Sequence, residues 1–125
     1  MDVFRLSGSY TTQPSQPGSG LPGAEATIDE TLALAKAPVV AEYHLDTDAV
    51  ATVSLAGLSN VSVLVVKATG GKVRVRITSA DGATQAIPVD SLLILTSLTV
   101  PITAIDLMRV TNIPAVARVT LGERG

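Results

Sequence analysis

The sequence of 125 residues contains no cysteine, and aromatic residues make up only 2% of it. The lack of cysteine excludes a small scaffold held together by disulfides, although it does not separate intracellular from extracellular proteins. The first ten residues include an aspartate and lack an apolar segment, so we expect no secretory signal there. No apolar run reaches membrane-spanning length and the net charge is −2, so we expect contact with neither membranes nor nucleic acid.

The sequence also lacks a recognisable catalytic constellation. His44 is the only histidine and has no cysteine to pair with, so we interpret it as a histidine on the face of a strand. Asp46 and Asp48 could bind calcium, but an EF-hand loop beginning at Asp46 would need glycine where Ala51 stands and glutamate where Gly57 stands. We therefore predict a protein that is not an enzyme, with no catalytic residues, no metal site and no cofactor.

Short runs of valine, leucine, isoleucine and threonine, separated by turn residues, fill most of the chain. The central two runs, Val61–Thr69 and residues 72–79, are joined by two glycines that tolerate the positive φ angles of a tight turn. This pattern predicts a hairpin with a two-residue loop, in which Val66 lies opposite Val75. One face of the pair would then be apolar and would cover a core.

The next turn contains an Asp-Gly pair, and the alternation of apolar residues around it selects the loop length. A two-residue loop would turn Ile87 and Val89 away from the apolar face, whereas a three-residue loop over residues 81–83 places Val89 opposite Val75. We predict the three-residue loop. Pro88 cannot donate a backbone hydrogen bond, which indicates that its strand is short or lies at the edge of a sheet.

The N-terminal quarter has a different composition. Residues 1–10 can form a short strand, whereas residues 11–23 contain three prolines and three glycines among polar residues, which is typical of a segment without its own core. We expect this arm to lie on its own domain or on a neighbouring subunit. Residues 26–35 fit a helix opened by a capping box or a strand, and the β character of the rest of the chain favours a strand. The predicted division is an extended N-terminal arm, residues 1–26, and a β-sandwich domain, residues 27–125.

Further strands are expected at five places: Val39–Leu45, residues 49–55, Leu92–Leu95, residues 102–110 and residues 115–121. Eight to ten short strands at this spacing predict an all-β fold, an antiparallel β-sandwich or small barrel, with a jelly roll as the leading topology. The run Leu92–Leu95 is apolar on both faces, so we expect it to lie between layers or at an interface.

One cluster of polar residues stands out from the rest of the sequence, and its members are basic. Lys67, Lys72, Arg74 and Arg76 are predicted to share one face, with Lys67 opposite Arg74 and with Asp90 opposite Arg74 on the next strand. This group is either a solvated sheet face or a docking patch for an acidic surface. The candidate interface comprises these four residues and five nearer the N-terminus: Phe4, Tyr10, Pro14, Pro17 and Pro22.

Three stretches carry a resemblance to a known group of proteins. With the extended start and the Pro/Gly arm, YHLDTDAVATVSLAGLSNVSVLVVKATGGKVRVRIT, QAIPVDSLLILTS and PITAIDLMRVTNIPAVARVTLG make the chain similar to small β-sandwich structural proteins of tailed-bacteriophage virions. The resemblance covers roughly residues 43–122 and transfers no functional residue. It implies a non-enzymatic capsid decoration, or cement, protein that sits as a homotrimer on the major capsid protein at the capsid surface. The alternatives are a tail, baseplate or fibre-attachment subunit, and a glycan-binding adhesin, which the few aromatic residues disfavour.

Overall fold

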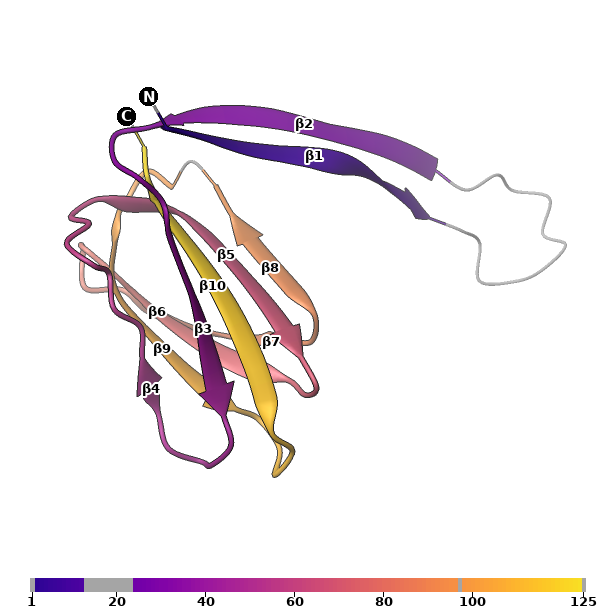
Figure 1. The fold of residues 1–125 in the computed structure, drawn as a ribbon, viewed down its shortest axis with the longest axis vertical. Helices are drawn as coiled ribbons and strands as arrows, with labels where there is room; N and C mark the ends of the chain where they lie inside the picture. The colour runs from indigo at the N-terminus through magenta and orange to yellow at the C-terminus, as the bar shows by residue number, and fades with distance from the viewer. Residues whose placement is uncertain (1, 13–23, 97, 125) are drawn as a thin grey trace, which may run out of the picture.

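The computed structural model describes residues 2–12, 24–96 and 98–124, and these residues form ten antiparallel strands without a helix (Figure 1). In chain order the strands are β1 (Asp2–Thr12), β2 (Ala24–Leu34), β3 (Val39–Leu45), β4 (Ala51–Thr52), β5 (Val61–Thr69), β6 (Val73–Ser79), β7 (Thr84–Val89), β8 (Leu92–Leu95), β9 (Ile102–Arg109) and β10 (Ala115–Glu123). The predicted all-β class is therefore confirmed. In the described part of the chain, no helix has the length and hydropathy needed to cross a membrane.

Eight of the strands form the body, which is an antiparallel β-sandwich (Figure 1). Strands β3, β10, β5 and β8 make one layer, called sheet I below, and β4, β9, β6 and β7 make the other, called sheet II. The two layers are linked at one corner, where Val61 of β5 pairs with Ile102 of β9. Within the body, β3 pairs with β10, β4 with β9, β5 with β8 and β6 with β7. Counted along the eight strands of the body, the first therefore pairs with the eighth, the second with the seventh, the third with the sixth and the fourth with the fifth.

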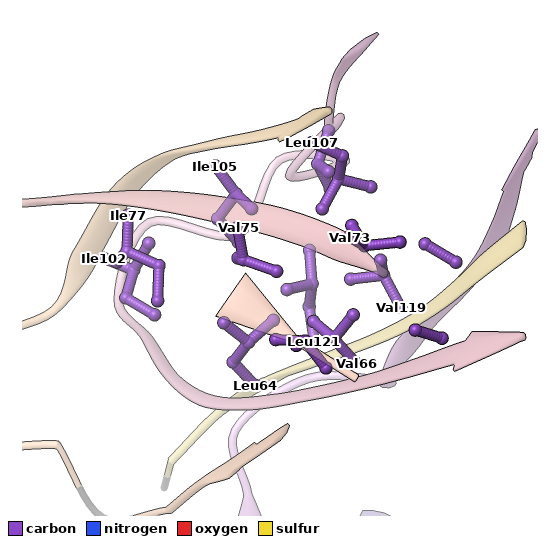
Figure 2. Packing of buried hydrophobic residues seen from close by; sticks show 14 of the residues in the cluster. Leu64, Val66, Val73, Val75, Ile77, Ile102, Ile105, Leu107, Val119 and Leu121 are labelled. Carbon is purple, nitrogen blue, oxygen red and sulfur yellow. The ribbon is translucent and has the colours of Figure 1, made fainter. Parts of the chain in front are cut away.

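The core lies between the two sheets and consists of small aliphatic side chains (Figure 2). Because side chains alternate along a strand, every second residue of a strand enters this layer. Leu64 and Val66 of β5, Val75 of β6, Leu107 of β9 and Val119 of β10 are 0 to 1% exposed. Full burial of one such side chain stabilises the fold by about 1.5–3 kcal/mol. The β-branched composition thus explains both the strands and the core, without an aromatic residue at its centre.

The predicted hairpin between β5 and β6 is wrong. These strands belong to different sheets, since β5 pairs with β10 and β8 whereas β6 pairs with β9 and β7. The chain crosses from sheet I to sheet II at Gly70, whose φ of 84° is in the left-handed region that favours glycine. Val66 and Val75 both point into the core as predicted, but they come from opposite layers instead of lying side by side in one sheet.

The loop between β6 and β7 has the predicted three residues, but it begins one residue earlier. The backbone N–H of Ser79 donates to the carbonyl of Ala83 across 2.9 Å, so the loop is residues 80–82. Val89 consequently pairs with Val73, and Arg74 pairs with Pro88 instead of with Asp90. The pairing is offset by two residues, which leaves every side chain on its predicted face. Strand β7 ends sheet II, which confirms the edge position inferred from proline.

The remaining two strands, β1 and β2, form a separate antiparallel hairpin that projects from one corner of the body (Figure 1). The strand interpretation of residues 26–35 is thereby confirmed over the helix. The predicted boundary between residues 26 and 27 falls inside β2, so the hairpin, and not an arm ending at residue 26, is the structural unit. One other expectation needs correction, because β4 is shorter than the predicted strand at 49–55. Of the two positions expected for Leu92–Leu95, burial between layers is excluded, since β8 is an edge strand in which Leu92 is 55% exposed, and the position at an interface stays a prediction.

Candidate interaction surfaces

The polar residues considered for catalysis or metal binding lie apart on the surface. His44 is exposed on β3, and its Nε2 lies 3.1 Å from Oε1 of Glu42, which confirms the interpretation of a strand-face histidine. Asp48 is engaged by Arg109, whose Nε donates to Oδ1 across 2.8 Å. Among the described residues no three acidic or histidine side chains are grouped so that they could hold a metal ion.

Tyr43 is poorly placed to stack on a sugar ring. Its ring is half-buried against the core, and its hydroxyl oxygen accepts a hydrogen bond from the backbone N–H of Ser54 across 3.2 Å. Glycan modules need an exposed ring face. The surfaces that remain for function are therefore the hairpin, the outer face of sheet I and the outer face of sheet II.

The hairpin has one apolar face and one polar face. Directly paired residues share a face, and the pairs Phe4–Leu32 and Gly8–Ile28 lie on one side together with Leu6. Phe4, Leu6, Ile28 and Leu32 are each half-buried, and the hairpin as a whole extends away from the body (Figure 1). We call this side the inner face of the hairpin. It also carries the exposed carboxylate of Glu30, which pairs with Leu6.

The base of the hairpin is fixed to the outer face of sheet I. Leu34, the last residue of β2, is 4% exposed because it packs over Gly122 and Val63. A Cβ atom at Gly122 would lie 3.1 Å from Cδ2 of Leu34 and 3.2 Å from Cβ of Val63, so a larger residue would require these neighbours to move by a few tenths of an ångström. The next residue, Ala35, donates its backbone N–H to the carbonyl of Glu123 across 2.8 Å. The hairpin thus begins on the body with its inner face toward sheet I.

The carboxylate of Glu123 strengthens the same junction. It is nearly buried, and its Oε2 accepts the backbone N–H of Ser59 at 3.2 Å and lies 3.9 Å from Nζ of Lys36, the second residue after β2. A partly buried carboxylate requires such partners, because burial without them is costly. This cluster ties the end of β10 to the segment that connects the hairpin with β3.

The outer face of sheet I beyond this junction carries apolar residues, two cations and the carboxylate of Glu42. Across the four strands, Val40, Thr120, Val65 and Ile94 form one row, and Glu42, Arg118, Lys67 and Leu92 form the next. Val40 is 50% exposed and Leu92 is 55% exposed. None of the ion pairs between described residues involves Lys67 or Arg118, although the two lie opposite each other on β5 and β10. Like charges in that position destabilise a sheet unless a partner compensates them.

The outer face of sheet II contains a shallow depression of about 230 Å³. It is lined by Val50, Arg74, Arg76, Ala86, Asp106, Leu107 and Met108. Small-molecule sites typically enclose roughly 300–1,000 Å³, so this depression fits a single side chain better than a cofactor. The cation of Arg74 beside Val50 and Met108 suits a carboxylate carried on a partly apolar protein surface.

Asp106 organises the charges in this depression. Nε of Arg76 donates to its Oδ2 across 3.1 Å, and the hydroxyl of Thr52 donates to its Oδ1 across 3.2 Å. The hydrogen bonds from Arg76 hold the pKa of Asp106 below its usual value, against a smaller opposing effect of burial. Arg76 is therefore committed to Asp106, and Arg74 is the cation in this depression that can meet a partner.

The predicted basic group does not form one patch. Lys67 lies on the outer face of sheet I, whereas Arg74 and Arg76 lie on the outer face of sheet II, and Lys72 lies in the exposed turn between the sheets. The error has the same cause as the wrong hairpin. Because β5 and β6 lie in different layers, their polar residues point to opposite outer surfaces of the sandwich. The predicted repulsion between Lys67 and Arg74 is consequently absent, and the repulsion that exists is between Lys67 and Arg118.

The N-terminal candidates are only partly placed. Phe4 lies on the inner face of the hairpin, where a contact surface was expected. Pro14, Pro17 and Pro22 lie outside the described residues, as does the side chain of Tyr10, so their predicted contacts remain predictions. The junction at Leu34 and Gly122 was not predicted, although a glycine inside a β-branched strand is a known signal of close backbone approach.

Comparison with models of protein families, with curated proteins and with solved structures finds no match to this chain.

Proposed function

We propose that this chain is a non-enzymatic structural protein that works by binding other protein subunits. More specifically, we propose that it belongs to a tailed-phage virion, where it decorates and stabilises the capsid by binding the major capsid protein as a homo-oligomer. The observation that carries the proposal is the β1–β2 hairpin: an apolar inner face projects from a sandwich whose core is already complete (Figure 1).

The physical argument starts from the marginal stability of such a hairpin. Two isolated strands in water are at best marginally stable, and stability requires packing of an apolar face against something else. Among the hairpin residues whose burial the structure describes, Leu34, at the base, is the one that is buried, whereas Phe4, Leu6, Ile28 and Leu32 continue the same face along the hairpin. A surface of this kind is typical of a protein that completes its structure upon assembly.

The order of the strands supports the same proposal. We interpret the pairing of first with eighth, second with seventh, third with sixth and fourth with fifth as a jelly roll, an architecture that includes capsid proteins. The depression around Arg74 would receive a carboxylate of the capsid protein on the outer face of sheet II. Each contact is small, but many copies on one shell would act together through avidity.

Quantitative mass spectrometry of purified particles tests the proposal by measuring copies of this chain relative to the major capsid protein. We expect copy numbers close to that of the capsid protein. A few copies per particle would assign the chain to the tail, baseplate or fibre-attachment region instead. Its complete absence from particles would overturn the virion proposal.

A further inference from the structure

We propose that the inner face of the hairpin of one copy binds the outer face of sheet I of a second copy of this chain. The inference deepens the proposed function, because it rests on the idea that the chain assembles and names which surfaces of it meet. It concerns contacts between identical chains, whereas decoration of a capsid concerns a different partner. The two can therefore fail separately.

The direction of the hairpin is the first argument. At its base, Leu34 already packs on the outer face of sheet I at Gly122 and Val63. From β10, which carries Gly122, the edge of the sheet is two strands away, or about 10 Å. The hairpin strands have 11 residues each and reach roughly 36 Å. Figure 1 shows the hairpin leaving the body beside the end of β10 and extending past the side on which β8 lies. The distal part of the hairpin therefore extends beyond the edge of its own sheet I, and the inner face there is free to contact sheet I of a second copy.

Charge complementarity is the second argument. The outer face of sheet I combines the exposed Leu92 and half-buried Val65 and Ile94 with Lys67 and Arg118. These two cations face each other across β5 and β10, and none of the ion pairs between described residues involves either of them.

The inner face of the hairpin combines apolar residues with the opposite charge. Its exposed carboxylates are Glu30 and, at the start of β1, Asp2, and neither takes part in an ion pair with a described residue. Arg118 has the carboxylate of Glu42 opposite it on β3, whereas Lys67 has Arg118 and Leu92 as its cross-strand neighbours. Docking this face on sheet I would place a carboxylate beside Lys67 and would cover apolar residues on both sides.

The size of the contact indicates how copies would be arranged. The part of the hairpin beyond its own sheet is about 26 Å by about 10 Å and offers roughly 260 Å² to its partner, about a third of the roughly 800 Å² per partner of a standard stable interface. The two surfaces differ, so the contact is heterologous, and each copy uses its hairpin on one neighbour and its sheet on another. A closed ring gives every copy two such contacts, whereas an isolated pair has one. We therefore expect a ring that forms cooperatively with concentration.

The absence of cysteine makes the contact directly testable by cross-linking. Full-length chains carrying Ile28→Cys or Leu92→Cys are purified separately, mixed and treated with a short bismaleimide. We expect a cross-linked dimer that contains one chain of each kind. The matched control is Thr31→Cys, an exposed position on the other face of the same hairpin strand, which should give at least about tenfold less of this dimer. Equal yields from the two hairpin positions would overturn the proposed orientation.

Charge exchange provides the second readout, by sedimentation velocity over a concentration series. We expect Glu30→Lys and Lys67→Glu each to weaken self-association by about tenfold, and the double variant to recover most of the loss. Ser7→Lys is the control, because Ser7 lies opposite Asp29 on the other face of the hairpin. A wild-type chain that stays monomeric at every soluble concentration would overturn the self-contact. If the chain is monomeric in solution but present in high copy number on particles, the decoration proposal would still hold. The capsid protein would then be the partner that covers the hairpin.

Discussion

At the scale of single residues, the side chains of this protein with the most defined polar geometry are those around Asp106. Its carboxylate accepts hydrogen bonds from Arg76 and Thr52, which come from a neighbouring strand in each direction across sheet II. The side chain of Asp106 is 20% exposed and that of Arg76 is 54% exposed, so solvent screens part of their attraction. The contacts of Asp106 with Thr52 and Arg76 thus hold strands β4, β9 and β6 in register, and they contribute modestly to stability.

The substitution Asp106→Asn tests this contribution. We expect it to lower the free energy of unfolding at pH 7 by about 1 kcal/mol, because a charged acceptor is replaced by a neutral amide. The pKa of Asp106 is lowered from 3.8 in the folded state, so the carboxylate stabilises the fold above the unfolded pKa and loses this effect as the pH falls through the folded pKa. Urea unfolding at pH 7 and at decreasing pH values below 3.8 should show a difference between wild type and variant that shrinks as the pH falls.

The matched control is Asp90→Asn, which removes a carboxylate that makes no hydrogen bond or ion pair with the described residues. Its effect should stay close to zero at both pH values. A loss for Asp106→Asn that persists unchanged in acid would mean that the amide disturbs packing, and that charge is not the cause.

At the scale of elements, the turn between β5 and β6 decides the architecture, because it sends the chain from one sheet to the other. Gly70 has a φ of 84°, and a Cβ atom there would lie 3.3 Å from the carbonyl oxygen of Pro114 in the turn before β10. The turn therefore combines a left-handed residue with a close approach to backbone that cannot move freely.

Replacing Gly70 with alanine should lower the free energy of unfolding by about 2 kcal/mol, measured by urea denaturation. Left-handed backbone costs a residue with a side chain about 1–2 kcal/mol, and the contact with Pro114 adds to this. Gly82→Ala separates the two effects, since Gly82 has a φ of 86° but has nothing within 4 Å of its Cβ position. Losses of equal size at both glycines would show that the close approach carries no cost.

The same turn shows what the sequence could and could not predict about the elements. Alternation of apolar residues correctly identifies Val66 and Val75 as core residues, because it depends only on the period of a strand. It does not identify the partner strand: residues facing each other across a sandwich and residues paired within one sheet have the same pattern. The predicted hairpin assumed that the two strands pair directly within one sheet. The candidate basic patch depended on that pairing and is also wrong, since Lys67 and Arg74 lie on opposite outer faces.

The N-terminal surface was predictable to a similar degree. The alternation around Phe4 and Leu6 and the alternation from Ile28 to Leu34 were both visible in the sequence, yet nothing local indicates that the two stretches pair across residues 13–23. Pairing of that kind depends on closing a loop, which costs similar entropy for many alternative partners. Gly122 within a β-branched strand indicates that some neighbour approaches closely, but its partner, Leu34, could not be predicted for the same reason.

At the scale of the whole molecule, the body and the hairpin have separate apolar surfaces. The body encloses a core that includes none of the hairpin side chains that the structure describes. Of their mutual contacts, the packing of Leu34 on Val63 and Gly122 and the hydrogen bond from Ala35 to Glu123 are the best defined. A unit with its own core can fold alone, whereas a two-stranded hairpin cannot be expected to do so.

A chain that begins at Leu34 should therefore keep the fold of the body and lose the ability to assemble. We expect cooperative urea unfolding with a midpoint and slope close to those of the full chain, and a free energy of unfolding within about 1–2 kcal/mol of it, because little apolar area is removed. Leu34 is retained because it covers Val63, which would otherwise become exposed. Sedimentation velocity should show only monomer. Failure of this shortened chain to fold would show that the hairpin stabilises the sandwich itself, and assembly through the hairpin could then no longer be separated from folding.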